Sequence, residues 1–135
     1  MSAKVFPARK DVLPEVLAFA EAELEQLESR PKAVMQVTIS IEELFVNVAS
    51  YAYNGAEGDV CVEIAALDDT RVLIRMTDSG TRFDPLAKDD PDITLSAEER
   101  RIGGLGIFMV KKYMDSMEYE YKDSKNVLTM IKTVK

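Results

Sequence analysis

Two pairs of short alternating segments, each pair joined by a tight polar turn, restrict most strongly what this chain can fold into. In the first pair, residues 60–66 and 72–76 flank an Asp-Asp-Thr turn. In the second pair, residues 117–121 and 127–132 flank an Asp-Ser-Lys-Asn turn. Alternation with a period of two is typical of strands, and turns this short join antiparallel neighbours. The sequence therefore predicts two β-hairpins.

Helical periodicity occupies most of the remaining chain. Apolar residues recur at helical spacing over residues 12–28 and again over residues 32–52, with a Ser-Arg-Pro break between them. A third helical pattern covers residues 105–115, between the hairpins, and residues 4–8 fit a short edge strand. This order predicts an α+β fold, a two-layer α/β sandwich in which helices cover one face of a mostly antiparallel mixed sheet.

The length and the composition limit the class of protein. A chain of 135 residues predicts one domain, residues 1–135. The sequence contains no stretch of about 18 uncharged apolar residues that could span a membrane, and its N-terminus lacks the pattern of a signal peptide. We therefore expect a cytoplasmic protein that does not bind membranes. Cys61 is the only cysteine, so no intrachain disulfide forms. The formal net charge of −7 argues against a direct nucleic-acid surface, and the absence of histidine excludes imidazole metal sites and phosphohistidine chemistry.

Two polar residues of the second predicted helix are not explained by packing. The apolar stripe of residues 34–52 points one way, at about 100° per residue, whereas Glu43 and Asn47 lie about 110–150° from its centre. They are one turn apart and share a face, which the adjacent Glu42 does not. Glu42 is therefore interpreted as a solvated surface residue, and Glu43 with Asn47 as a candidate site.

Glycines mark two further candidate positions. Asp78-Ser79-Gly80 follows the second predicted strand, and Gly103, Gly104 and Gly106 open the third helix. A glycine cluster at a helix N-terminus suits phosphate, because free N–H groups and the helix dipole favour an anion there. The same cluster also fits a tight turn that packs a helix on a sheet. Residues 81–102, between the two glycine motifs, show no core pattern and are predicted to form a lid.

These three motifs, in this order, resemble the N box, G1 box and G2 box of the GHKL (Bergerat-fold) ATP-binding superfamily. The resemblance covers about residues 34–131. The segments 78–85 and 103–115 are most similar to the anti-sigma-factor serine/threonine protein kinases. These 135 residues contain no histidine to accept phosphate and leave no room for a phosphoacceptor helix pair, so we expect that the chain is not a complete histidine kinase. The fold that the resemblance implies agrees with the one that the periodicity predicts.

The resemblance implies roles for individual residues. Asp78 would accept a hydrogen bond from the adenine amino group, Gly80 would let the chain pass the base, and Thr129 would join the adenine network through its hydroxyl. Asn47 would bind Mg²⁺, and Glu43 would be the catalytic base that orients a substrate hydroxyl. The ATP phosphates would lie against the start of the third helix, at Gly103, Gly104, Leu105, Gly106 and Ile107.

Two positions depart from the superfamily pattern, and the role of two arginines is left undecided between two alternatives. Arg82 replaces the second G1 glycine, as the anti-sigma subgroup commonly tolerates, and Tyr51 replaces a histidine that many relatives carry. Arg100 and Arg101 are either phosphate ligands from the lid or ordinary exposed residues.

The resemblance implies an ATP- and Mg²⁺-dependent serine/threonine kinase that acts as an anti-sigma factor in a partner-switching circuit. Its substrate would be a STAS-type anti-anti-sigma protein, and it would also bind a sigma factor or another regulator. The alternative is a nucleotide-dependent binding adaptor without kinase activity; an isolated ATP-hydrolysing module is disfavoured by the lack of a transducer domain. Because relatives commonly dimerise, a homodimer is expected.

Overall fold

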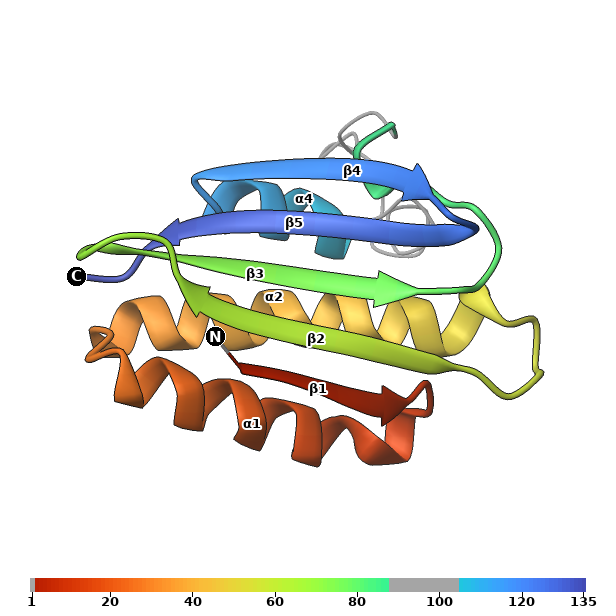
Figure 1. The fold of residues 1–135 in the computed structure, drawn as a ribbon, viewed down its shortest axis with the longest axis horizontal. Helices are drawn as coiled ribbons and strands as arrows, with labels where there is room; N and C mark the ends of the chain where they lie inside the picture. Colours follow the sequence, from red (N-terminus) through yellow and green to blue (C-terminus); the bar gives the residue numbers. More distant parts are fainter. Residues whose placement is uncertain (1, 88–104) are drawn as a thin grey trace.

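The computed structural model describes residues 2–87 and 105–135 (Figure 1). Most of the predicted lid, together with Arg100, Arg101, Gly103 and Gly104, lies outside these residues. The sheet strands are β1 (Ser2–Pro7), β2 (Asp59–Ala66), β3 (Arg71–Asp78), β4 (Ser116–Lys122) and β5 (Lys125–Thr133). The helices are α1 (Leu13–Gln26), α2 (Pro31–Asn47) and α4 (Leu105–Tyr113), with short helical turns η1 (Lys10–Val12), η2 (Val48–Ala52) and η3 (Pro85–Ala87).

The five strands form one sheet in the order β1-β2-β3-β5-β4. Both predicted hairpins are confirmed, because β2 pairs with β3 and β4 pairs with β5. The pairing of β3 with β5 joins the two hairpins and brings Asp78 opposite Asn126. All four pairings among the described strands are antiparallel, so the expectation of a mixed sheet is corrected to a purely antiparallel one over these residues.

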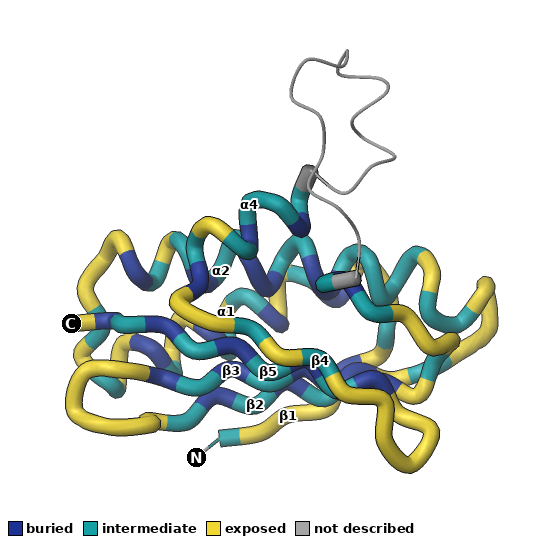
Figure 2. Tube along the Cα trace, turned by 90° about the horizontal axis from the view of Figure 1, so that it is seen from above, coloured by how far each residue is buried: buried dark blue, intermediate teal, exposed yellow. Residues whose placement is uncertain are grey.

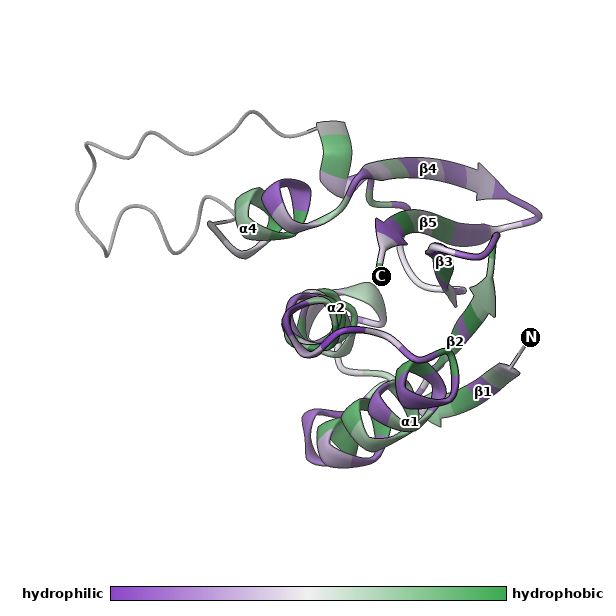
Figure 3. Ribbon diagram, turned by 90° about the vertical axis from the view of Figure 1, so that its left-hand side faces the viewer, coloured by the Kyte–Doolittle hydropathy of each residue, from purple (hydrophilic) through white to green (hydrophobic). Residues whose placement is uncertain are grey.

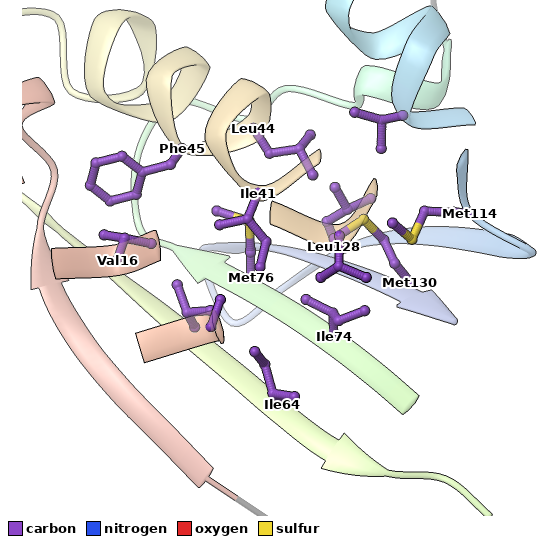
Figure 4. Packing of buried hydrophobic residues seen from close by; sticks show 14 of the residues in the cluster. Val16, Ile41, Leu44, Phe45, Ile64, Ile74, Met76, Met114, Leu128 and Met130 are labelled. Carbon is purple, nitrogen blue, oxygen red and sulfur yellow. The ribbon is translucent and has the colours of Figure 1, made fainter. Parts of the chain in front are cut away.

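The helices α1, α2 and α4 lie on one side of the sheet, as Figure 3 shows. On β2 and β3 every second residue is buried against them, and the residues between are less covered (Figure 2). Ile41 of α2 extends toward Met76 of β3, and Phe45 of the same helix points to the side where Val16 of α1 lies (Figure 4). The two-layer α+β architecture predicted from the sequence is therefore confirmed.

The helix α2 forms the centre of the helical layer. By length and composition Pro31–Ala52 is apolar enough to cross a membrane, with a mean hydropathy of 1.2. However, Val37, Ile41 and Phe45 of this helix are fully buried in the domain core. The segment is thus explained as the core helix, whose apolar stripe faces the sheet.

The last turn of this helical segment is widened. The single helix predicted for residues 32–52 changes at Asn47 from α-helix to the π-helical turn η2. Such turns are rare and often accompany functional sites. The widened turn carries the carbonyl group of Ala52 to within 2.7 Å of the Thr81 backbone nitrogen, which donates a hydrogen bond to it.

The helix α4 is anchored to the sheet at its C-terminal end. The Lys132 ammonium of β5 donates a hydrogen bond to the carbonyl oxygen of Tyr113, at 2.5 Å. Burial lowers the pKa of Lys132, while the nearby Asp115 carboxylate opposes this effect. A cation at a helix C-terminus is favourable, so this contact helps to fix α4 and with it the position of Gly106 at the other end.

Candidate functional site

A cavity of about 690 Å³ lies at the end of the sheet where β3 stops. Its walls come from α2 and η2, from the loop after β3, from the first turn of α4 and from β4 and β5. Much of its lining is apolar and consists of Leu44, Val48, Met76, Ile107 and Leu128. A volume of this size suits a nucleotide or another small molecule, and the apolar walls suit a planar base.

Asp78 supplies a carboxylate to this apolar cavity. It is the last residue of β3, and only 8% of its surface is exposed. Its Oδ1 atom accepts hydrogen bonds from the Gly80 backbone nitrogen and from Asn126 Nδ2, both at 2.9 Å. Its Oδ2 atom has no hydrogen-bond partner among the described residues. One carboxylate oxygen is therefore held by the protein and the other remains available to a donor on a ligand.

Gly80 allows the loop after Asp78 to pass close to η2. A Cβ atom at this position would lie 2.7 Å from the Ala52 carbonyl carbon and 2.5 Å from the Ala52 Cβ. Backbone atoms cannot swing aside as a flexible side chain can, so any side chain at residue 80 forces the loop and η2 apart. The hydrogen bond from Thr81 to Ala52 depends on this close approach.

Asn126 is a site residue that the sequence analysis missed. Its Nδ2 atom donates to Asp78 Oδ1 and, at 2.9 Å, to the Thr81 carbonyl oxygen. Its Oδ1 atom accepts from the Phe83 backbone nitrogen at 3.0 Å and from the Tyr119 hydroxyl at 2.5 Å. Burial raises the pKa of Tyr119, which keeps this hydroxyl protonated as a donor. A sequence signal was present: Asn126 stands two positions before Leu128, so the two side chains point to the same face of the strand, and a polar residue on an apolar face needs an explanation.

Thr129 lies on the opposite face of the sheet from the cavity. Its neighbours Leu128 and Met130 are buried beneath the helices, whereas Thr129 is half-buried and accepts a hydrogen bond from Arg75 Nε at 3.2 Å. The expectation that its hydroxyl joins the adenine network is corrected, because adjacent strand residues point to opposite faces. The polar residue of β5 that faces Asp78 is Asn126.

Glu43 and Asn47 lie one turn apart on α2, as the helical pattern predicted. Asn47 lines the cavity, and neither side chain makes a hydrogen bond or ion pair within residues 2–87 and 105–135. The Glu43 carboxylate packs against Gly106 in the first turn of α4. A Cβ at Gly106 would overlap Glu43 Oε2 and lie 2.8 Å from Glu43 Cδ. The missing side chain of this glycine thus makes room for Glu43.

The structure places the other predicted residues as follows. Ile107 is 5% exposed and lines the cavity, and Leu105 is the first residue of α4. Tyr51, which the resemblance aligns with a histidine of many relatives, lines the cavity but is 72% exposed. Arg82 lies over the ring of Tyr121, 5.1 Å from its centroid, and also lines the cavity. The structure therefore brings Asn47, Asp78 and Ile107 to one cavity, with Glu43 and Gly106 together beside it.

The donor set fits a nucleotide with its magnesium ion better than a metal bound by protein alone. Among the described residues, no three cysteine, aspartate or glutamate side chains gather into a metal site. The Asn47 side-chain carbonyl is an oxygen ligand of the kind that Mg²⁺ uses, and Mg²⁺ in such sites takes its remaining ligands from phosphates and water. The free Oδ2 of Asp78 in an apolar cavity suits a base that carries an N–H donor.

One family model and several known proteins match this chain. Residues 6–132 match the histidine kinase-like ATPase domain family. Serine-protein kinase RsbW of Listeria monocytogenes serovar 1/2a is 29% identical over 124 residues, which cover 85% of this chain and 78% of that protein. Serine/threonine-protein kinase BtrW of Bordetella bronchiseptica is 26% identical, over 70% of this chain and 66% of BtrW. The solved structure of Acinetobacter baumannii histidine kinase AdeS covers 99% of this chain and 68% of its own, with a TM-score of 0.47 and 16% identity.

Proposed function

The chain belongs to the histidine kinase-like ATPase domain family, and from this premise we propose that it is an ATP- and Mg²⁺-dependent serine/threonine protein kinase. In this proposal it acts as an anti-sigma factor and phosphorylates a STAS-type anti-anti-sigma protein. The observation that carries the proposal is the joint placement of two carboxylates: Asp78, which lines the cavity with its Oδ2 free of described partners, and Glu43, which lies beside the cavity one helical turn from the lining residue Asn47.

Binding of the base would depend on Asp78 and the apolar walls. Its Oδ2 would accept a hydrogen bond from the exocyclic amino group of adenine, while Leu44, Met76 and Leu128 exclude water around the ring. A buried acceptor is costly when it has no partner, so a base without an N–H donor at this point would bind far more weakly.

The transfer step would depend on α2 and the start of α4. Mg²⁺, when bound, neutralises the phosphate charge that develops during transfer. Asn47 would hold the ion through its side-chain carbonyl, and the backbone of Gly103, Gly104, Leu105, Gly106 and Ile107 would face the phosphates. Glu43 would accept a hydrogen bond from the substrate serine or threonine hydroxyl and orient it toward the phosphate.

The printed names of the relatives support a protein as the phosphate acceptor. RsbW and BtrW are named as serine-protein and serine/threonine-protein kinases, which favours a protein hydroxyl as the acceptor. We propose a STAS-type anti-anti-sigma protein as the substrate, a sigma factor or another regulator as the second partner, a homodimer as the assembly and the cytoplasm as the location. The net charge of −7 suits basic protein surfaces and disfavours direct binding of nucleic acid.

The second candidate is an adaptor that binds nucleotide and changes partners without transferring phosphate. It would need Asp78 and the cavity but not Glu43. A carboxylate beside the first turn of α4, where the phosphates are expected, repels them and has no evident value in an adaptor. The position of Glu43 therefore favours the kinase.

The test is a transfer assay with γ-labelled ATP, Mg²⁺ and STAS-domain proteins from the same organism as candidate substrates. Wild type is compared with Glu43→Gln and with the matched control Glu42→Gln, which changes the adjacent carboxylate. We expect label on the STAS protein with wild type and Glu42→Gln, and a loss of at least about 100-fold with Glu43→Gln. Tight ATP binding by wild type without any transfer would contradict the kinase and support the adaptor.

A further inference from the structure

We propose that Asn126 sets the base preference of the cavity, because its amide fixes the Asp78 carboxylate so that only Oδ2 is presented to a ligand. This inference rests on nucleotide binding, the first element of the proposed function. Asn126 acts through Asp78 and is therefore a positioning residue. It is 7% exposed and lies opposite Asp78 across the ladder between β3 and β5.

Backbone groups determine which way the Asn126 amide faces. The Phe83 N–H can only donate, so the atom it contacts at 3.0 Å must be the Asn126 oxygen. The Thr81 carbonyl can only accept, so the atom 2.9 Å from it must be the Asn126 nitrogen. The nitrogen therefore faces Asp78 Oδ1, at 2.9 Å, and donates to it. A flipped amide would lose both backbone contacts.

The fixed amide determines what Asp78 offers. Asp78 Oδ1 already accepts from Asn126 Nδ2 and from the Gly80 backbone nitrogen, so it is engaged and the plane of the carboxylate is held. The outer oxygen, Oδ2, is left as an acceptor without a donor of its own among the described residues. A base with an amino group at this point satisfies it, whereas a base with a carbonyl group there places two acceptors together.

Other side chains do not reproduce this arrangement. Asn126 Oδ1 also accepts from the Tyr119 hydroxyl, so the amide links β3, β4, β5 and the loop at residues 81–83. A hydroxyl residue has one donor and cannot serve both Asp78 and Thr81. An aspartate has no donor when it is ionised and would repel Asp78. Only an amide of this length supplies donors on one side and an acceptor on the other.

The first test measures base discrimination in direct binding assays with ATP and inosine triphosphate, whose base carries a carbonyl in place of the adenine amino group. We expect wild type to prefer ATP by about 100-fold or more. Asn126→Ala should reduce this ratio by at least about tenfold, mainly through weaker ATP binding. The matched control Val127→Thr changes the next residue, which faces the other side of the sheet, and should keep the wild-type ratio. Equal weakening of both nucleotides by Asn126→Ala would show a merely structural role and overturn the inference.

The second test uses Asn126→Asp, which preserves the shape of the side chain. Two carboxylates at hydrogen-bond distance share a proton, and the protonated form again donates to Asp78. ATP affinity relative to wild type should therefore recover by at least about tenfold as the pH is lowered from 8 to 5.5. The titratable groups near the amide are Asp78 and Tyr119, with Arg82 and Asp84 acting on Tyr119 from the loop. An affinity ratio that does not change with pH would contradict the proposed donor role.

The two proposals fail differently. Wild-type protein that prefers ATP over inosine triphosphate but transfers no phosphate would overturn the kinase and leave the role of Asn126 intact. Wild-type protein that transfers phosphate but binds both nucleotides equally would overturn the role of Asn126 and leave the kinase intact.

Discussion

The two ends of the cavity are built in different ways. At the base end, formed by Asp78, Gly80 and Asn126, polar side chains are held by hydrogen bonds between β3, β5 and the loop after β3. At the proposed phosphate end, Asn47 lines the cavity, and Glu43 and Gly106 lie together beside it. The Glu43 and Asn47 side chains make no hydrogen bond or ion pair within the part of the chain that the structure describes. The first end is fixed in advance, and the second leaves its polar groups available.

This difference matches the two tasks that we propose. Recognition of a base requires acceptors that do not move, because discrimination depends on leaving the wrong base unsatisfied. Transfer of a phosphate requires side chains that are free to engage a metal ion and a substrate hydroxyl. Substitutions at the base end should therefore change affinity, and substitutions at the phosphate end should change the rate.

The largest effect is expected for Asp78→Asn at the base end. The new amide oxygen can still accept from Gly80 and Asn126, but its NH₂ group would replace Oδ2 and face the adenine donor. We expect at least a 100-fold loss of ATP affinity, about 2.8 kcal/mol, measured by calorimetry. The midpoint of thermal unfolding should stay within about 4 °C of wild type. Unchanged affinity would remove Asp78 from the site.

Gly106→Ala is the corresponding test of the phosphate end. The new Cβ would overlap the Glu43 carboxylate, which is the end of a flexible side chain and can move aside. We expect phosphate transfer to fall by about 10- to 100-fold while ADP affinity changes by less than about threefold, because a displaced base affects the rate rather than binding.

A double variant tests whether Gly106 makes room for Glu43 or for the phosphates. If Gly106 serves Glu43, then adding Glu43→Gln to Gly106→Ala should lower the rate no further than Glu43→Gln alone. A large loss of ADP affinity in Gly106→Ala would instead mean that the glycine serves the phosphates directly.

Gly80→Ala places the same methyl group at the base end, where it meets backbone. The Ala52 carbonyl carbon would be 2.7 Å away and cannot rotate out of the way. We expect a loss of about 1–3 kcal/mol in the free energy of unfolding, together with weaker ATP binding. Denaturant unfolding measures the first and calorimetry the second. Wild-type stability in this variant would show that the loop and η2 separate easily.

Tyr119→Phe removes one hydrogen bond from the base end, at a cost of about 1 kcal/mol near neutral pH. Burial raises the pKa of Tyr119 in the folded protein above its value of 10.0 in the unfolded chain. The folded state therefore binds more protons above pH 10, and the contribution of Tyr119 is lost as the pH rises through its folded pKa. The difference in unfolding free energy between wild type and Tyr119→Phe should shrink above pH 10. A constant difference would contradict the contact.

The smallest effect is expected for Thr129→Val. Its hydroxyl accepts a hydrogen bond from Arg75 on the face away from the cavity, so ATP affinity should remain within about twofold of wild type, which is well below 1 kcal/mol. The result distinguishes two roles for Thr129: the structure places its hydroxyl away from the cavity, whereas the family resemblance assigned it to the adenine network. A tenfold loss of affinity would restore that assignment.

The sequence predicted the fold and much of the site because these depend on local patterns. The two hairpins and the three helices follow from periodicities of two and 3.6, and the segment boundaries agree within a few residues except at η2. Glu43 and Asn47 share a helical face by virtue of their spacing alone. Asp78 was placed correctly at the end of a strand because a strand pattern precedes it.

The residues of β5 could not be assigned in this way. Alternation divides the strand into two sets, and the set with Val127, Thr129 and Ile131 is no less apolar than the set with Asn126 and Lys132. Nothing local shows which set lies under the helices. Packing of α2 and α4 on the sheet decided it, and the buried set is the one that contains the two polar residues.

The sequence by itself thus determined the elements, their order and the residues whose roles depend on spacing within one element. Only the tertiary structure determined that Asn126 contacts Asp78, 48 residues away, and that Gly106 makes room for Glu43. The physical reason is that covalent geometry fixes which residues of one helix or strand share a face, whereas the register between strands and the packing of helices fix which faces meet.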